Sequence, residues 1–198
     1  MNRRDAIGWL SGAAGTLALS PFAAARSQAA PTTELYRNAT VIVGNMDAPL
    51  DDKVHLSPKL VDQVRSSGIT ALKMTLGGGD YKNKAQTDAQ IAEFDRSIAL
   101  NSDIYIKVSS LDDLKKAKSE GKVGIIYSFE GGAMLEGQLE NIEHFRRAGV
   151  LVMGLTYNLK TPFASGTMEP EPTGLTALGR EAVIRMNAQG IMLDISHC

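Results

Sequence analysis

Short apolar segments alternate with amphipathic segments from residue 39 onward, and this alternation restricts the chain to a small group of folds. Six segments rich in β-branched and aliphatic residues are predicted strands: 39–44, 69–76, 104–108, 123–129, 150–156 and 191–195. The intervening segments repeat apolar residues at helical spacing, and a glycine follows four of them: Gly68, Gly121, Gly149 and Gly190. Buried strands joined by helices predict an α/β fold with a parallel sheet and right-handed crossovers.

Two architectures fit this pattern, an open doubly wound sheet and a (β/α)8 TIM barrel of the metallo-dependent hydrolase type. No GxGxxG motif follows the first predicted strand. The glycines at 77–79 lack the Lys-Ser/Thr pair of a phosphate-binding loop, so we interpret them as a turn. Thr87 and Gln90 fit a capping box and predict the start of the helix that follows.

The first thirty residues have the pattern of an export signal. Arg3 and Arg4 precede a stretch without charged residues at 6–25, and small residues follow at 23–29. Paired arginines before a weakly apolar, glycine-rich segment are typical of the twin-arginine route. The alternative is a membrane anchor, against which the glycines and Pro21 argue. We therefore expect a signal at 1–30, a mature domain at 31–198, and a periplasmic or secreted location.

Charge and cysteine content exclude several classes of protein. The chain of 198 residues carries 21 Lys and Arg against 22 Asp and Glu, so it lacks the basic excess of a nucleic-acid-binding protein. A single cysteine permits neither an internal disulfide nor a cysteine-rich zinc knuckle. With only three histidines, a metal site in this chain would depend largely on carboxylates.

Polar side chains stand where the predicted strands end, which is where both candidate architectures gather their chemistry. The residues in question are Asn45, Asp47, Glu130, Tyr157 and His197. Carboxylates and imidazoles hold divalent cations, and two cations that share a carboxylate activate a bridging water for hydrolysis.

Each of these residues also has a structural alternative. Glu130 could cap the next helix or pair with a lysine, and Asp47 could belong to a turn before Pro49. His197 could be a buried structural histidine, and Tyr157 could close the core. Asp194 has the opposite strand parity to His197, so we expect it to face the helices.

Three long motifs narrow these alternatives: YSFEGG at 127–132, LENIEHFRRAGVLVMGLTYN at 139–158 and GLTALGREAVIRMNAQGIMLDISHC at 174–198. They resemble the membrane (renal-type) dipeptidase family, the M19 metallopeptidases. The resemblance covers most of the mature chain and is strongest from residue 123 to the end. It implies a (β/α)8 barrel that binds two Zn²⁺ ions and hydrolyses the peptide bond of dipeptides through a metal-activated water.

The resemblance also implies roles for individual residues. Glu130 matches the catalytic carboxylate that bridges the two metals, and His197 matches the first of two late histidine ligands. Asp47 matches the aspartate of an early His-x-Asp pair. Two positions depart from the family pattern: Asn45 replaces the early histidine, which puts one metal site in doubt, and Tyr157 replaces a substrate-binding histidine.

Length separates this chain from a complete barrel. A (β/α)8 barrel takes about 250 residues, whereas the mature part holds about the first five barrel strands and lacks the second late histidine. We therefore expect the N-terminal portion of a longer dipeptidase, inactive by itself.

A non-catalytic barrel relative that binds a peptide or an amino-acid derivative is the alternative, favoured by Asn45. Expected partners are a dipeptide and the twin-arginine machinery, and a homodimer remains open.

Overall fold

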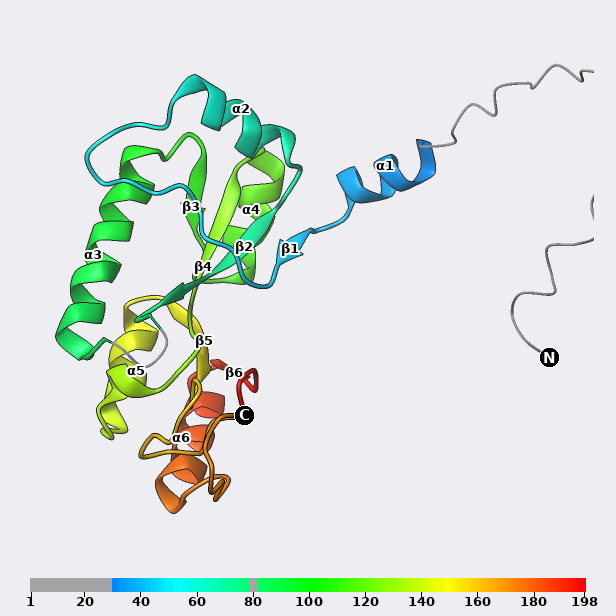
Figure 1. Ribbon diagram of the computed structural model, residues 1–198. Helices are drawn as coiled ribbons and strands as arrows, with labels where there is room; N and C mark the ends of the chain where they lie inside the picture. The colour runs from blue at the N-terminus through cyan, green and yellow to red at the C-terminus, as the bar shows by residue number, and fades with distance from the viewer. Residues whose placement is uncertain (1–29, 79–81) are drawn as a thin grey trace, which may run out of the picture.

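A parallel sheet of six strands organises the chain (Figure 1). The structure is a computed structural model that describes residues 30–78 and 82–198. The strands are β1 (Ile42–Val43), β2 (Ala71–Leu76), β3 (Tyr105–Lys107), β4 (Val123–Phe129), β5 (Val150–Gly154) and β6 (Met192–Asp194). The α-helices are α1 (Ala30–Asn38), α2 (Pro58–Ser66), α3 (Lys84–Leu100), α4 (Leu111–Glu120), α5 (Glu140–Arg147) and α6 (Ala177–Ala188), with a 3₁₀ turn η1 (Ala133–Leu135).

Five strands follow one another in the order β1-β2-β4-β5-β6, and β3 pairs with the first residues of β4. Every pairing is parallel. The five-strand path agrees with the number of barrel strands that the sequence predicts. Five of the six predicted strands are shorter than expected. The strands predicted at 39–44, 104–108 and 191–195 lose residues at both ends, the one at 69–76 loses its first two and the one at 150–156 its last two.

Helices cover one face of this sheet. The Tyr127 hydroxyl of β4 donates to Asp95 of α3 at 3.0 Å, and the Phe129 ring meets Phe145 of α5 edge-on at 4.8 Å. Residues of the opposite parity, such as Ser128, therefore point to the other face, which we call the inner face. On it, the strands present Lys73, Thr75, Ser128, Gly154 and Asp194; Thr75 is opposite Ser128, and Gly154 is opposite Asp194.

The inner face distinguishes the two predicted architectures. Its apolar side chains Ile42 and Met192 are 48% and 68% exposed, so no described helix covers them. In a flat sheet, three strand spacings would separate β2 from β6 by about 14 Å. Lys73 of β2 nevertheless reaches Asp194 of β6 across this face, at 3.1 Å. The sheet is therefore curved, as in a partial (β/α)8 barrel, and a doubly wound sheet with helices on both faces is excluded.

Helix boundaries follow local side-chain chemistry, with one departure from expectation. Ser57 and Ser110 cap α2 and α4, and Gly121 ends α4 in the left-handed conformation. The predicted capping box of Thr87 and Gln90 is wrong. The box consists of Asn83 and Gln86, one turn earlier. Asparagine is as good an N-cap as serine or threonine, so Asn83 begins the helix before Thr87 can.

The structure describes part of the predicted glycine turn and almost nothing of the predicted signal. Gly77 and Gly78 both have positive φ, which agrees with the predicted turn after β2, and the third glycine lies outside the described residues. The predicted signal at 1–30 likewise lies almost wholly outside them. Helix α1 projects away from the sheet (Figure 1). In the described ranges, no helix combines the length and apolarity needed to cross a bilayer.

Candidate active site at the strand ends

Glu130 stands directly after β4, and its carboxylate is held by Asn45. The Asn45 Nδ2 donates to Glu130 Oε1 at 2.7 Å. The hydroxyl of Thr75, on β2, donates to Asn45 Oδ1 at 3.3 Å, which turns the amide oxygen away from Glu130. Asn45 thus presents a hydrogen-bond donor to the carboxylate, where the family's histidine would present a metal-binding nitrogen.

No cation balances the charge of Glu130 within the described part of the chain. Neither Lys, Arg nor His forms an ion pair with it there, and Asn45 is its one side-chain partner. The two structural alternatives for this residue, a helix cap and a lysine pair, are therefore absent among the described contacts. A partly buried carboxylate with a neutral partner is suited to binding a cation from solution.

Two glycines allow the backbone at Glu130 to approach β5. A Cβ atom at Gly154 would lie 2.4 Å from the carbonyl oxygen of Glu130, and one at Gly132 would lie 2.6 Å from that of Leu155. Both distances are below any normal contact, so the segment after β4 lies directly against β5. At Gly132, the space that a side chain would take is occupied by the backbone of Leu155, directly after β5.

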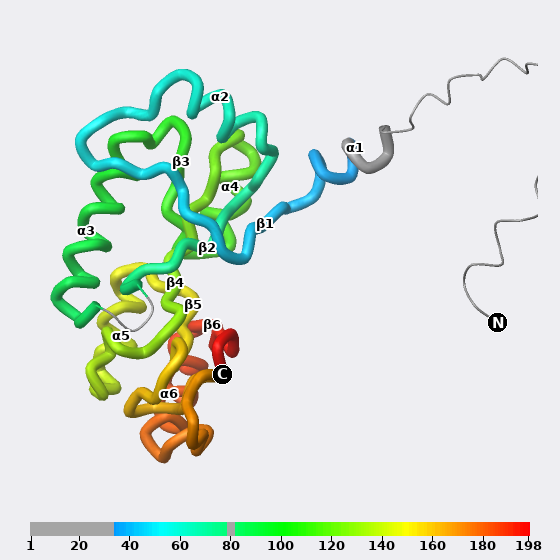
Figure 2. Tube along the Cα trace, viewed as in Figure 1, coloured from blue at the N-terminus to red at the C-terminus, as the bar shows by residue number. Residues whose placement is uncertain are grey.

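His197 and Tyr157 lie together at the ends of β6 and β5. Their ring centroids are 4.3 Å apart, with the planes tilted by 41°. The backbone of His197 is in the left-handed region, with φ of 65°, and its carbonyl accepts from the Thr167 N–H at 3.0 Å. Figure 2 shows the C-terminal end of the chain lying beside the loop that precedes α6.

Asp194 faces inward, which corrects the sequence-based expectation that it faces the helices. Its Oδ2 accepts from Lys73 at 3.1 Å on the inner face. The expectation assumed strand alternation up to His197, but β6 ends at Asp194 and His197 has left-handed geometry, so parity does not carry across. Burial alone would raise the pKa of Asp194, but hydrogen bonds from Ser196 and Lys73 outweigh it and lower the pKa.

Asp47 lines a pocket that Glu130 does not line. This pocket, of about 260 Å³, lies between α2 and the sheet, and Leu60, Val64 and Leu72 also line it. Among residues 30–78 and 82–198, no three His, Cys, Asp or Glu side chains gather closely enough to hold a metal ion. A joint metal site of Asp47, Glu130 and His197 stays a prediction.

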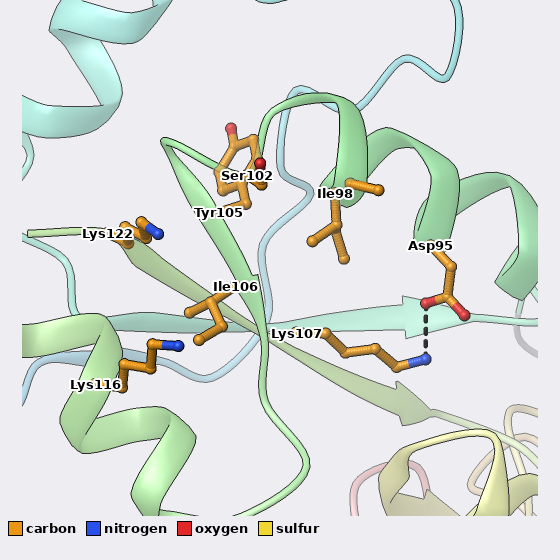
Figure 3. A pocket seen from close by; sticks show the side chains of 9 residues that line it. Asp95, Ile98, Ser102, Tyr105, Ile106, Lys107, Lys116 and Lys122 are labelled. Atoms are coloured by element: carbon orange, nitrogen blue, oxygen red, sulfur yellow. Dashed lines mark hydrogen bonds and ion pairs between the residues drawn. The ribbon is translucent and has the colours of Figure 1, made fainter. Parts of the chain in front are cut away.

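A second pocket, of about 410 Å³, lies between α3, β3 and α4 and contains none of the predicted site residues (Figure 3). Three lysines line it, and Lys107 pairs with Asp95 at 2.7 Å. Lys122 and Lys116 both lie near Glu120, at 2.8 Å and 3.9 Å. Because each lysine has an acidic partner, this pocket does not provide a strongly basic anion site.

Sequence reasoning missed Lys73 and Thr75 as members of the inner face. A signal was present, because these two polar residues stand two positions apart inside an apolar strand. Such spacing places both on the same side of β2. Their partners could not be read from the sequence, since Asp194 is 121 residues away and Asn45 is 30 residues away.

Comparison with known proteins identifies the group to which this arrangement belongs. Residues 31–198 match the model of the membrane dipeptidase family, peptidase family M19. Dipeptidase 3 of Rattus norvegicus is 31% identical over 96 residues, which are 46% of this chain and 19% of the rat protein.

Solved structures of related proteins share the fold of this chain. An amidohydrolase from Pseudomonas aeruginosa superposes with a TM-score of 0.73 and 32% identity, covering 83% of this chain and 48% of that one. A metallopeptidase from Rhodobacter sphaeroides, liganded with a phosphinate mimic of the dipeptide L-Ala-D-Ala, shares the fold at a TM-score of 0.59 and 16% identity, with 80% and 59% covered.

The chain thus spans about half of these solved relatives and a fifth of the rat protein. Within that span, the family match runs from residue 31 to residue 198, so it includes Glu130 and His197 and the whole of the curved parallel sheet. The chain belongs to the membrane dipeptidase family, peptidase family M19.

Proposed function

We propose that the whole protein is a zinc-dependent dipeptidase whose site is built around Glu130. One observation carries this proposal: a carboxylate at the carboxyl end of a barrel strand has a neutral partner and, among the described residues, no cationic one. Active sites of (β/α)8 barrels form at this end of the strands. Membership of a dipeptidase family supplies the reaction class.

The ligand types present in the described residues suit zinc, but there are fewer ligands than a catalytic zinc requires. Glu130 and His197 supply a carboxylate and an imidazole, whereas a catalytic zinc takes three protein ligands. The described residues therefore contribute part of the site, with Asp47 as a further predicted ligand. When bound, zinc would supply an activated water and polarise the peptide carbonyl. Tyr157 would orient the substrate, since its hydroxyl can donate to a carbonyl oxygen.

Dipeptide hydrolysis by the whole protein tests the proposal. L-Ala-D-Ala is a suitable first substrate, because the Rhodobacter sphaeroides relative binds a mimic of it. We expect zinc-dependent release of free alanine, lost on chelation and restored by added zinc. The alternative, a non-catalytic barrel relative, is favoured by Asn45. It predicts dipeptide binding, measured by calorimetry, with no alanine released at any zinc concentration.

Asn45→His is expected to raise bound zinc from about one tight ion to about two per chain, since imidazole is a stronger zinc donor than an amide oxygen. Because Asn45 contacts Glu130 directly, the new ring would lie beside the Glu130 carboxylate. Metal content of the purified whole protein measures this, with Asn45→Gln as a control that adds no imidazole. Equal metal content in parent and Asn45→His would contradict the role assigned to position 45.

We also propose export through the twin-arginine route to the periplasm or beyond. The support is Arg3-Arg4 ahead of an uncharged, glycine-rich stretch. Replacing both arginines by lysine is expected to leave the protein in the cytoplasm with its signal uncleaved. Cell fractionation and the mass of the mature chain measure this. Normal export of the lysine variant would speak against this route, and an uncleaved membrane-bound parent would favour the anchor.

A further inference from the structure

We propose that the Lys73–Asp194 ion pair positions His197, by tying the end of β6 to β2 across the inner face. The pair connects strands that are not neighbours, since β4 and β5 lie between them. The expected effect of this ion pair on metal binding and turnover rests on the proposed function. Its expected effect on the position of the His197 ring is independent of that function.

Both members of the pair are largely buried, and both carboxylate oxygens of Asp194 accept hydrogen bonds. The side chains of Lys73 and Asp194 are 15% and 13% exposed. One carboxylate oxygen of Asp194 accepts from Lys73 Nζ at 3.1 Å. The other accepts from the backbone N–H of Ser196 at 2.9 Å and from the Ser196 hydroxyl. Asp194 thus connects Lys73 to the residue that immediately precedes His197.

The segment that carries His197 is held at two places. Beyond Asp194, where the strand ladder with β5 ends, Ile195 is 74% exposed and contributes little packing. His197 itself takes its left-handed conformation, and its carbonyl accepts from the Thr167 N–H at 3.0 Å and from the Thr156 hydroxyl at 3.4 Å. Those contacts hold the backbone of His197, whereas the Asp194–Ser196 turn and its anchor on Lys73 act earlier, where the chain leaves β6.

A role in stability alone would not explain this pair. Removing two charges from water costs about as much as their attraction returns, so buried ion pairs add little net stability compared with apolar residues. Their contribution is to orientation, because a misplaced partner leaves an unpaired buried charge. Outer partners of metal ligands act in this way, and losing one typically lowers metal affinity or activity about ten- to a hundredfold.

Lys73→Met tests the inference, since methionine keeps most of the side-chain length and removes the charge. The direct measurement is the NMR cross-peak between the His197 and Tyr157 rings, whose centroids are 4.3 Å apart. Residues 1–198 contain three histidines, and a His197→Gln variant assigns the signal that is required. We expect Lys73→Met to weaken this cross-peak strongly and to lower zinc affinity at least about tenfold. Lys73→Arg should restore both.

Lys107→Met is the matched control. Lys107 pairs with Asp95 at 2.7 Å, in a more exposed ion pair on the helix-covered side of the sheet that lines the pocket between α3, β3 and α4 (Figure 3). Its loss is expected to lower thermal stability and to leave the His197–Tyr157 cross-peak and zinc affinity unchanged.

The double variant Lys73→Met/Asp194→Asn covers the case in which Lys73→Met does not fold, because it removes both charges and keeps the acceptor for Ser196. We expect it to fold with a weakened cross-peak. A cross-peak and zinc affinity equal to the parent's in any folded Lys73 variant would overturn the positioning role. If the parent protein neither binds zinc nor cleaves dipeptides, the proposed function is wrong. The His197–Tyr157 cross-peak still tests the positioning role in that case.

Discussion

Glu130→Gln is expected to remove bound zinc and dipeptide hydrolysis from a protein that remains folded. Glutamine has the shape of glutamate, and its side-chain oxygen can still accept from Asn45 Nδ2, so the contact seen at 2.7 Å survives. What disappears is the negative charge, which no other described residue at this point supplies. The fall in turnover should be at least about a hundredfold, because even outer partners of metal ligands are worth about ten- to a hundredfold.

Zinc per chain and the thermal midpoint, measured on one sample, separate this role from a structural one. Glu140→Gln is the matched control, since Glu140 is an exposed residue in the first turn of α5 on the following segment. It should change stability by about 0.5 kcal/mol through the helix dipole and leave zinc and turnover intact. Normal zinc and normal turnover in Glu130→Gln would refute the assignment.

Gly154→Ala is expected to destabilise the protein and to impair zinc binding at the same time. The new Cβ would stand 2.4 Å from the carbonyl oxygen of Glu130, a backbone atom that cannot rotate away. Either β5 or the segment after β4 must move, and overpacking of this kind costs about 1–3 kcal/mol. Because the displaced residue is Glu130 itself, the movement reaches the candidate metal ligand directly.

Gly44→Ala provides the comparison, because a Cβ there has nothing within 4 Å and the backbone has no positive φ. Denaturant unfolding should show a loss for Gly154→Ala and no loss for Gly44→Ala. Zinc titration of the folded fraction then shows whether the ligand moved. An unchanged free energy of unfolding for Gly154→Ala would mean that β4 and β5 separate more easily than their close approach suggests.

Local and periodic features of the fold were predictable. The strand at 123–129 was predicted with the bounds it has, because a mostly apolar run lies between Gly121 on one side and Glu130 on the other. Serine caps and terminal glycines act over three or four residues, so these helix ends could also be predicted from the sequence. The first residue of α3 could not be predicted. The sequence offers two overlapping capping patterns, and only the backbone conformation decides between Asn83 and Thr87.

The candidate site was predictable in part. Placing Asn45 and Glu130 at one end of a barrel anticipated their contact, since barrel strands converge there. The direction of Asp194 could not be inferred, because alternation fails where β6 ends and the chain turns. The position of Asp47 beside α2 depends on the path of a loop, which no periodicity determines.

The ion pair between Lys73 and Asp194 also bears on the order in which the chain folds. Its members are 121 residues apart, so closing that loop carries a large entropic cost unless intervening elements have already formed. Pairing of β2 with β4, and then of β4 with β5 and β6, shortens the effective loop step by step. The inner-face pair therefore belongs to the last contacts to form and contributes more to slowing unfolding than to speeding folding.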